Sequence, residues 1–259
     1  MRRLQVEHEH QQLSLFHENT VIQRAAFLEA VELLCGRIEN LYQNWNRGWL
    51  SSRDRGAYGY YLYSFAYRVL SLISVCYQIE KDANYVRSVA AVDRGGDLRS
   101  AAKLNIAAWT RASLFDGLSY DDEQAPDHFY RDALAEVTSH FGDLDNRLPI
   151  STFRALVPGS GHAYQEVFDF LEGLVPEEQG RYRYDRVVAV YLVGLGSLAL
   201  FDRMSNEDTY STMRRGAEQC RNSEVLVNLG RLVEASSLSR KEGYRVLMRV
   251  LADEVQSRT

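Results

Sequence analysis

Two aspartates with nearly identical surroundings are the residues of this chain whose type and setting best suit chemistry. Asp116 and Asp202 lie in the segments 113–122 and 199–208, which share the pattern Leu-Phe-Asp, any residue, Leu or Met, Ser, any residue, acid, Asp. Carboxylates that converge on one point provide the hard oxygen ligands that Mg²⁺ prefers. The candidate metal ligands are therefore Asp116, Asp121, Asp122, Asp202 and Asp208.

The same repeat also has an architectural interpretation. An apolar stretch precedes each copy, at 101–112 and at 187–198, and each copy contains a serine suited to cap a following helix. One hypothesis is duplication, with two pseudo-repeated helical halves that bring Asp116 and Asp202 together. The alternative is that each copy is only a helix stop, made of an aromatic anchor, an aspartate and the cap of the next helix. The sequence leaves both open.

Aspartate-rich motifs in a helical protein invite comparison with the isoprenoid synthases. That comparison fails on two points. Asp121-Asp122-Glu123 is not followed by an acid two positions further on, and no Asn-Ser-Glu set at fourfold spacing follows Asp202. A metal-dependent helical enzyme around Asp116 and Asp202 therefore remains a hypothesis without a family motif.

The HEPN ribonucleases, another all-helical class, carry an arginine followed at short distance by a histidine. Here the nearest pairs are Arg131 with His140 and Arg154 with His162, and both are too widely spaced. A HEPN-like or nucleic-acid-binding protein that lacks a recognised motif is thus a further alternative.

A second group of candidate residues combines aromatic rings with arginines between 42 and 68. Its members are Trp45, Arg47, Trp49, Arg53, Arg55 and Tyr58. Tryptophan, tyrosine and arginine are the residue types that dominate binding energy at protein interfaces, and the same types stack bases and contact phosphates. The sequence therefore indicates a contact surface for another protein or for nucleic acid, with ordinary packing as the third interpretation.

The elements that must position these residues are helices. Only four prolines are present, all between 122 and 176, and apolar residues recur at spacings of three and four in most other segments. The segment from Val187 to Phe201 carries no charge, while Arg181, Arg183 and Arg186 precede it, so we expect a helix that is buried on nearly all sides. The sequence predicts an all-α fold, a multi-helix bundle of about ten helices.

Two glycines lie inside this expected core helix. Gly194 and Gly196 each cost roughly 0.5–1 kcal/mol relative to alanine in a helix interior. Something must compensate, either another helix that packs closely against the backbone or a pocket for a flat ligand. Close helix packing is the favoured interpretation.

The organisation along the chain follows from the same pattern. Residues 1–19 are a polar lead-in and residues 20–259 a single helical domain, with a boundary in 142–161 if the chain has two halves. Asp82 is expected to open a short third helix and 98–118 to form a fourth. In 57–79 the only charge is Arg68, which at mid-membrane would cost roughly 2.5–3.5 kcal/mol, so we expect a buried helix and no membrane span.

Charge is unevenly distributed along the chain. The net charge is −5, yet residues 45–111 contain ten Lys or Arg against five Asp or Glu, and residues 112–180 contain three against fourteen. Such polarity predicts one basic and one acidic face, able to meet two partners or to stack head to tail as a homo-oligomer. Three widely spaced cysteines indicate neither a disulfide framework nor a zinc site and suit a reducing cytoplasm.

Together these features predict an interaction or adaptor subunit of a cytoplasmic protein complex. It would act through the arginine and aromatic surface and through a separate acidic face. Other protein subunits are the expected partners, with nucleic acid as an alternative, and no cofactor is expected unless the aspartates bind Mg²⁺.

Overall fold

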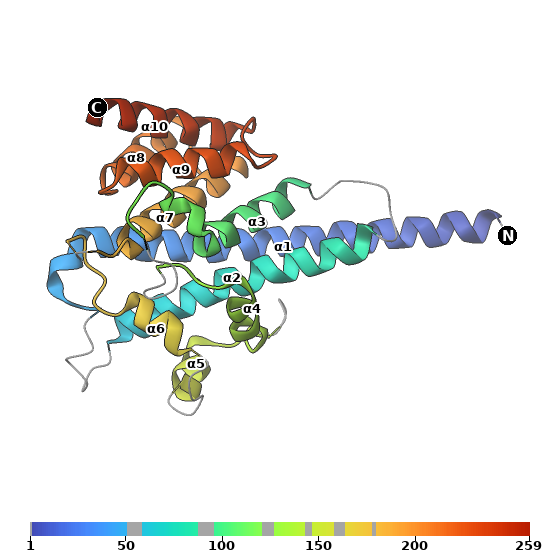
Figure 1. Cartoon of the computed structure of the whole chain (residues 1–259). Coiled ribbons are helices and arrows are strands. Elements are labelled where there is room, and N and C mark those ends of the chain that lie inside the picture. Colours follow the sequence, from blue (N-terminus) through green and yellow to red (C-terminus); the bar gives the residue numbers. More distant parts are fainter. Residues whose placement is uncertain are drawn as a thin grey trace.

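The computed structural model describes the backbone of residues 2–50, 59–87, 96–120, 127–142, 147–157, 164–177 and 180–259. Within these ranges the side chains of 2–17, 83–87 and 206–207 are left undescribed. The described residues form ten α-helices and no strand, which confirms the all-α prediction (Figure 1). The helices are α1 (Arg2–Asn44), α2 (Tyr60–Arg87), α3 (Gly96–Thr110), α4 (Arg131–Ser139), α5 (Ile150–Leu156), α6 (Gln165–Leu171), α7 (Arg183–Leu200), α8 (Asn206–Glu218), α9 (Ser223–Glu234) and α10 (Glu242–Arg258), with the 3-10 helices η1 (Trp45–Arg47) and η3 (Ala112–Phe115).

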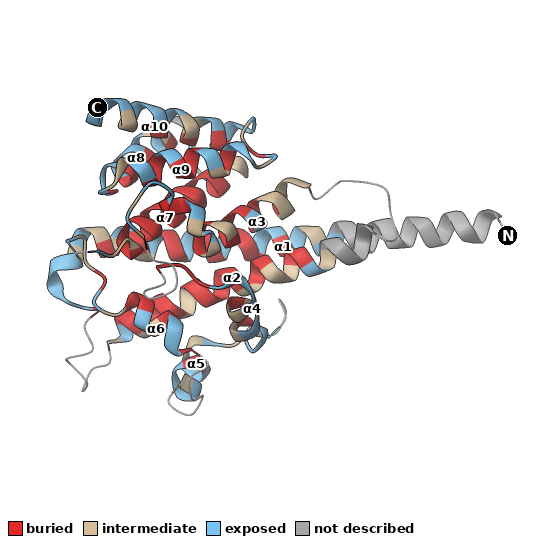
Figure 2. Cartoon of the chain, viewed as in Figure 1, coloured by how far each residue is buried: buried red, intermediate tan, exposed pale blue. Residues whose placement is uncertain are grey.

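The helix α7 is the centre of the bundle. Every residue from Arg183 to Leu198 is buried, and α7 packs against α1, α3, α8, α9 and α10. Figure 2 shows it as an almost uninterrupted buried segment. A helix enclosed by five others has no face in water, which explains the absence of charge between Val187 and Phe201. The predicted core helix is confirmed.

The other helices lie on two sides of α7. On one side α10 packs on both α8 and α9 (orange and red in Figure 1). On the other side α1 and α2 run antiparallel, since Gln23 donates to Asp82 (2.6 Å) while Arg37 donates to Ser64 (2.8 Å). The short helices α4, α5 and α6 pack on α2. The described helices do not form two repeated halves.

Arg186, in the first turn of α7, ties the C-terminal end of α3 to the core. Its fully buried guanidinium donates to the carbonyl oxygens of Ala108 (2.7 Å), Arg111 (2.9 Å) and Asp127 and lies 4.5 Å above the centre of the Phe115 ring. Burial lowers the pKa of Arg186 to about 9, so the group is protonated at neutral pH. Its charge meets the negative end of the α3 dipole.

Arg183 and Asp185, in the same turn, hold two further segments. Arg183 donates to the carbonyl oxygens of Asp169 and Phe170 at the end of α6, both at 2.8 Å. Asp185 accepts from the backbone N–H of Arg221 (2.7 Å) and from the side-chain amide of the next residue, just before α9 begins. Burial raises the pKa of the Asp185 carboxyl, while these donors oppose the rise. One helical turn therefore binds three other parts of the chain.

The glycines of α7 mark its closest contacts with other helices. A Cβ atom at Gly194 would lie 2.6 Å from the Cys35 sulfur of α1, and one at Gly196 would lie 2.9 Å from the Tyr244 ring of α10. The backbone of α10 approaches equally closely, because a Cβ atom at Gly243 would lie 2.6 Å from the Gly196 carbonyl oxygen. Neighbouring helices thus fill the space beside both glycines of α7, which accounts for them as packing residues.

Three helix boundaries differ from the sequence-based expectation. The backbone of α1 is helical from Arg2, so residues 2–19 of the expected polar lead-in are continuous with the helix that follows. The helix α2 runs through Asp82 to Arg87 instead of ending before it. The fourth expected helix, 98–118, is interrupted, because α3 ends at Thr110 and η3 follows. Residues 206–235 form two helices, α8 and α9.

One part of α2 has the length and apolarity that a membrane span requires. Among the described residues this is the segment Tyr60–Asp82, and 67% of the 18-residue apolar window within it is buried inside the bundle. The contacts of α2 with α1, α3, α4, α5 and α6 account for its apolar composition.

Two glycine substitutions test the close packing of α7 and α10. In Gly243→Ala the new Cβ atom would lie 2.6 Å from two backbone atoms, the Gly196 oxygen and the Leu200 nitrogen. Backbone cannot move aside, so we expect a loss of about 1–3 kcal/mol in the free energy of unfolding. The control Gly36→Ala meets nothing within 4 Å on α1 and should gain about 0.5–1 kcal/mol. Urea denaturation measures both, and equal stability of the two variants would contradict the packing described.

Candidate interaction surface

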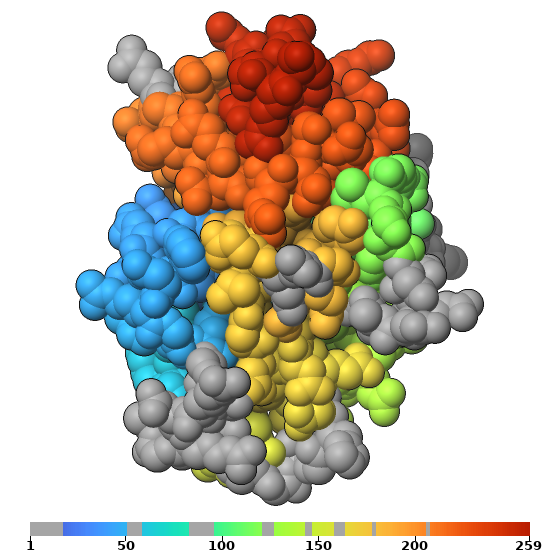
Figure 3. Space-filling view, turned by 60° about the vertical axis from the view of Figure 1, so that its left-hand side comes forward, coloured from blue at the N-terminus to red at the C-terminus, as the bar shows by residue number. Residues whose placement is uncertain are grey.

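The chain that leaves α1 turns sharply and is fastened to a distant loop. After η1, Gly48 adopts a left-handed conformation (φ 66°), which a residue without a Cβ atom enters at little cost. Leu50 then points inward, and its carbonyl oxygen accepts the N–H of Gly173 (3.0 Å), in the loop after α6. Figure 3 shows the end of α1 (blue) beside the chain that leads from α6 to α7 (yellow).

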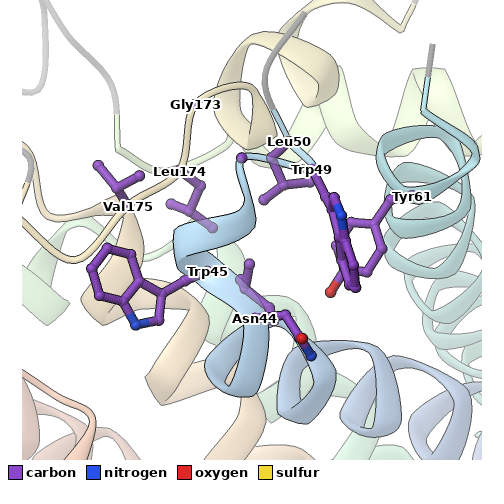
Figure 4. Close-up of a pocket in the computed structure, with 10 residues that line it drawn as sticks. Asn44, Trp45, Trp49, Leu50, Tyr61, Gly173, Leu174 and Val175 are labelled. Carbon is purple, nitrogen blue, oxygen red and sulfur yellow. The ribbon is translucent and has the colours of Figure 1, made fainter. Parts of the chain in front are cut away.

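Two tryptophans stand at the edge of a small apolar hollow formed by this junction. Trp45 is 36% exposed and Trp49 40% exposed. The hollow has a volume of about 70 Å³, and Figure 4 shows Trp45 on one side of it and Trp49 with Tyr61 on the other. Its lining residues are Leu41, Asn44, Trp45, Gly48, Trp49, Leu50, Tyr61, Gly173, Leu174 and Val175.

Arginines and aromatic rings alternate outward from the hollow. The Arg47 guanidinium lies 5.3 Å from the centre of the Trp49 ring, Trp49 lies 5.1 Å from Tyr61, and the Arg37 guanidinium lies 4.3 Å from Tyr61. Such cation–π contacts contribute about 0.5–1 kcal/mol each at exposed positions. We call the hollow together with Arg37, Arg47 and the three rings of Trp45, Trp49 and Tyr61 the tryptophan surface.

A second arginine approaches Arg37 from α2. Arg37 Nη2 donates to the Ser64 hydroxyl (2.8 Å), and Arg68 Nη1 donates to the same hydroxyl and to the Ser64 carbonyl oxygen (3.1 Å). Burial and the charge of Arg37 both lower the pKa of Arg68, while Tyr60 and Tyr61 act in the opposite direction. Two unit charges about 4 Å apart repel by roughly 1–4 kcal/mol between water and a partly buried site. The pair is therefore held together against its own repulsion.

The structure brings together part of the predicted contact surface. Trp45, Arg47 and Trp49 lie on it, whereas Arg53, Arg55 and Tyr58 fall outside the described residues. Sequence reasoning missed Arg37 and Tyr61 as members of this surface, and it missed Ser64 and Arg68, which lie next to Arg37. Only Arg68 carried a signal, as the single charge in an apolar stretch.

The structure places Asp116 and Asp202 apart. Asp116 is the residue after η3, beside the Arg186 end of α7, whereas Asp202 follows the other end of that helix. The helix rise puts about 21 Å between Arg186 and Leu200 along the axis. Both aspartates are exposed. The two carboxylates therefore do not face each other, contrary to the arrangement that a duplication would give.

Asp202 has a local structural role instead. It is left-handed (φ 58°), its N–H donates to the Ala199 oxygen (3.3 Å), and the N–H of Arg203 donates to the Leu198 oxygen (2.9 Å). This is the Schellman arrangement that ends helices. Ser205 then accepts the N–H of Asp208 (3.3 Å) and caps α8, as its spacing predicted.

The other candidate metal ligands do not form a Mg²⁺ site among the described residues. Asp121 and Asp122 lie outside the described residues. Among the residues that are described, no group of three His, Cys, Asp or Glu side chains is placed to hold a metal ion.

Comparison with known proteins does not assign this chain to a family. No protein-family model, no curated protein sequence and no solved structure matches the chain. The functional inference rests on the surface residues themselves.

The separation of Asp116 and Asp202 predicts their behaviour toward Mg²⁺. If the two aspartates shared one Mg²⁺ site, adding Mg²⁺ would raise the melting temperature of the wild type. Either Asp116→Asn or Asp202→Asn alone would abolish this rise. Because the two side chains lie at opposite ends of α7, we expect the effects of the two substitutions to be independent and additive in the double variant. Thermal melts at constant ionic strength measure this, and loss of one common Mg²⁺-dependent rise in each single variant would refute it.

Proposed function

We propose that the protein is a helical interaction subunit of a cytoplasmic complex and that it binds another protein through the tryptophan surface. The observation that carries the proposal is the pair of exposed tryptophans at the edge of an apolar hollow. Exposing a large apolar ring surface to water is unfavourable, and a bound partner would cover it. Tryptophan, tyrosine and arginine also provide most of the affinity at protein interfaces.

The size of the hollow indicates what enters it. At about 70 Å³ it is roughly half the ~150 Å³ cavity that accommodates a benzene ring. A branched aliphatic side chain such as leucine or valine fits this space better than an aromatic ring does. The partner segment should therefore present an aliphatic residue to the hollow.

The charges around the hollow indicate what flanks that residue. Arg37 and Arg47 lie on the rings beside it, and Arg68 is adjacent to Arg37. Acidic side chains on the partner would be steered toward these arginines and held by them. A partner segment with one aliphatic residue between acidic residues meets both requirements.

The acidic part of the chain offers a second, separate contact region. Its exposed carboxylates lie on α4, on α6 and in the turns next to helices: Asp116, Asp132, Glu136, Glu166, Asp169 and Glu177. These residues are distinct from the tryptophan surface, which supports a subunit that contacts two partners or a second copy of itself. The three cysteines are free and buried, which fits a reducing compartment.

Affinity measurements on matched variants test the proposed function. A tagged chain is used to recover its partner from native extract, and the purified partner is then titrated by calorimetry. Trp49→Ala removes a ring that stacks on both Arg47 and Tyr61, so we expect its dissociation constant to rise by about 10- to 100-fold. Trp45→Ala should behave similarly.

The control is Val227→Ala, which truncates an equally exposed apolar residue on α9 (36%). Its dissociation constant should stay within about twofold of wild type. Equal affinity of the Trp49 and Val227 variants would refute the surface. Light scattering of the isolated chain identifies the case in which the partner is a second copy.

A further inference from the structure

The arginine pair beside the tryptophan surface has unused hydrogen-bonding capacity. Each guanidinium carries five N–H donors. Within the described chain, Arg37 donates to Ser64 through Nη2 and Arg68 through Nη1, and the hydroxyls of Tyr61 and Tyr60 are their other polar partners. The Arg37 Nε atom is buried and has no acceptor. The two groups therefore hold several donors ready for an acceptor that the described chain does not provide.

The pair also lacks a counter-charge. Arg37 and Arg68 form no ion pair among the described residues, although other arginines of this bundle do, as Arg147 does with Glu29 (2.8 Å). The groups that oppose the lowered pKa of Arg68 are tyrosines and not carboxylates. Two partly exposed cations at one buried hydroxyl thus have no carboxylate partner in the described chain.

We propose that Arg37, Arg68 and Ser64 form a binding site for a phosphoryl group, free or carried on a larger molecule. The two guanidinium groups come from different helices and approach one point from α1 and from α2. A tetrahedral dianion offers several oxygens to two such groups and balances both charges, whereas a planar carboxylate matches a single guanidinium fork and carries one charge.

The surroundings of the site leave room for such a group. Arg68 lines a hollow of about 210 Å³ between α1 and α2, whose walls include Leu33, Ser71 and the ion pair of Glu29 with Arg147. Among the described residues that line the hollow, Glu29 is the one acid, and it pairs with Arg147. Arg37 also belongs to the tryptophan surface, but the inference does not depend on the proposed function, since a small anion can bind whether or not a partner protein does.

The test is a titration of the full chain with inorganic phosphate at constant ionic strength, in parallel with sodium acetate. Calorimetry gives the affinity, and ¹H–¹⁵N spectra report the arginine Nε–H groups. We expect saturable shifts of the Arg37 and Arg68 signals and at least tenfold weaker binding of acetate. Phenyl phosphate distinguishes the source: tighter binding than inorganic phosphate indicates a phosphoryl group carried on an organic molecule, and weaker binding indicates the free anion.

Matched variants separate binding from folding. Arg68→Gln should weaken phosphate binding at least tenfold, and it should melt no lower than wild type without phosphate because it removes a like charge. Arg147→Gln, on the same hollow but ion-paired, should retain affinity within twofold. If Arg68→Gln does not fold, as judged by circular dichroism, Arg37→Gln takes its place. The proposal is overturned if no arginine signal responds to phosphate, if acetate binds equally well, or if Arg68→Gln binds phosphate as wild type does.

Discussion

The bundle depends on charges that α7 carries into its core. Arg183, Asp185 and Arg186 occupy one helical turn, and all three are buried. Each is compensated mainly by backbone groups at the ends of other elements, namely α6, α9 and α3. Removing one partner of such a buried charge costs about 3–5 kcal/mol because the remaining charge is left uncompensated. The apolar side chains of α7 fill the core, and the charged turn fixes the positions of α3, α6 and α9 relative to α7.

The same turn determines the position of the tryptophan surface. Arg183 holds the last carbonyls of α6, and the next residues, Gly173 to Val175, form one wall of the hollow. The N–H of Gly173 then fixes the carbonyl oxygen of Leu50, in the turn that carries Trp49. The tryptophans are thus held by a continuous path from the core, and a surface ordered in advance loses less conformational entropy when a partner binds.

The sequence predicted what local pattern determines. The uncharged run after Val187 indicated a buried helix, the two glycines of α7 indicated close packing, and the Ser205 spacing indicated a cap. It did not reveal the burial of Arg183 and Arg186, because charged residues beside an apolar run normally mark its exposed end. Distant carbonyl oxygens that the fold brings close, among them those of α3, α6 and Asp127, make that burial tolerable.

The arrangement of the candidate sites could not be predicted from local sequence patterns either, because it depends on contacts between distant parts of the chain. The repeat around Asp116 and Asp202 records how two helical segments end, but it carries no information on where those ends lie. The contact of Arg37 with Tyr61 and Arg68 joins residues 24 or more positions apart. It depends on the antiparallel register of α1 and α2, which neither helix specifies alone.

We propose that this protein binds another protein through the surface at the end of α1. Hydrogen–deuterium exchange of the full chain, free and saturated with its purified partner, tests it most directly. We expect slower exchange in residues 45–50 and 172–177 when the partner binds, and unchanged exchange rates in α8 to α10. Slower exchange confined to α8, α9 or α10, with residues 45–50 unaffected, would contradict it.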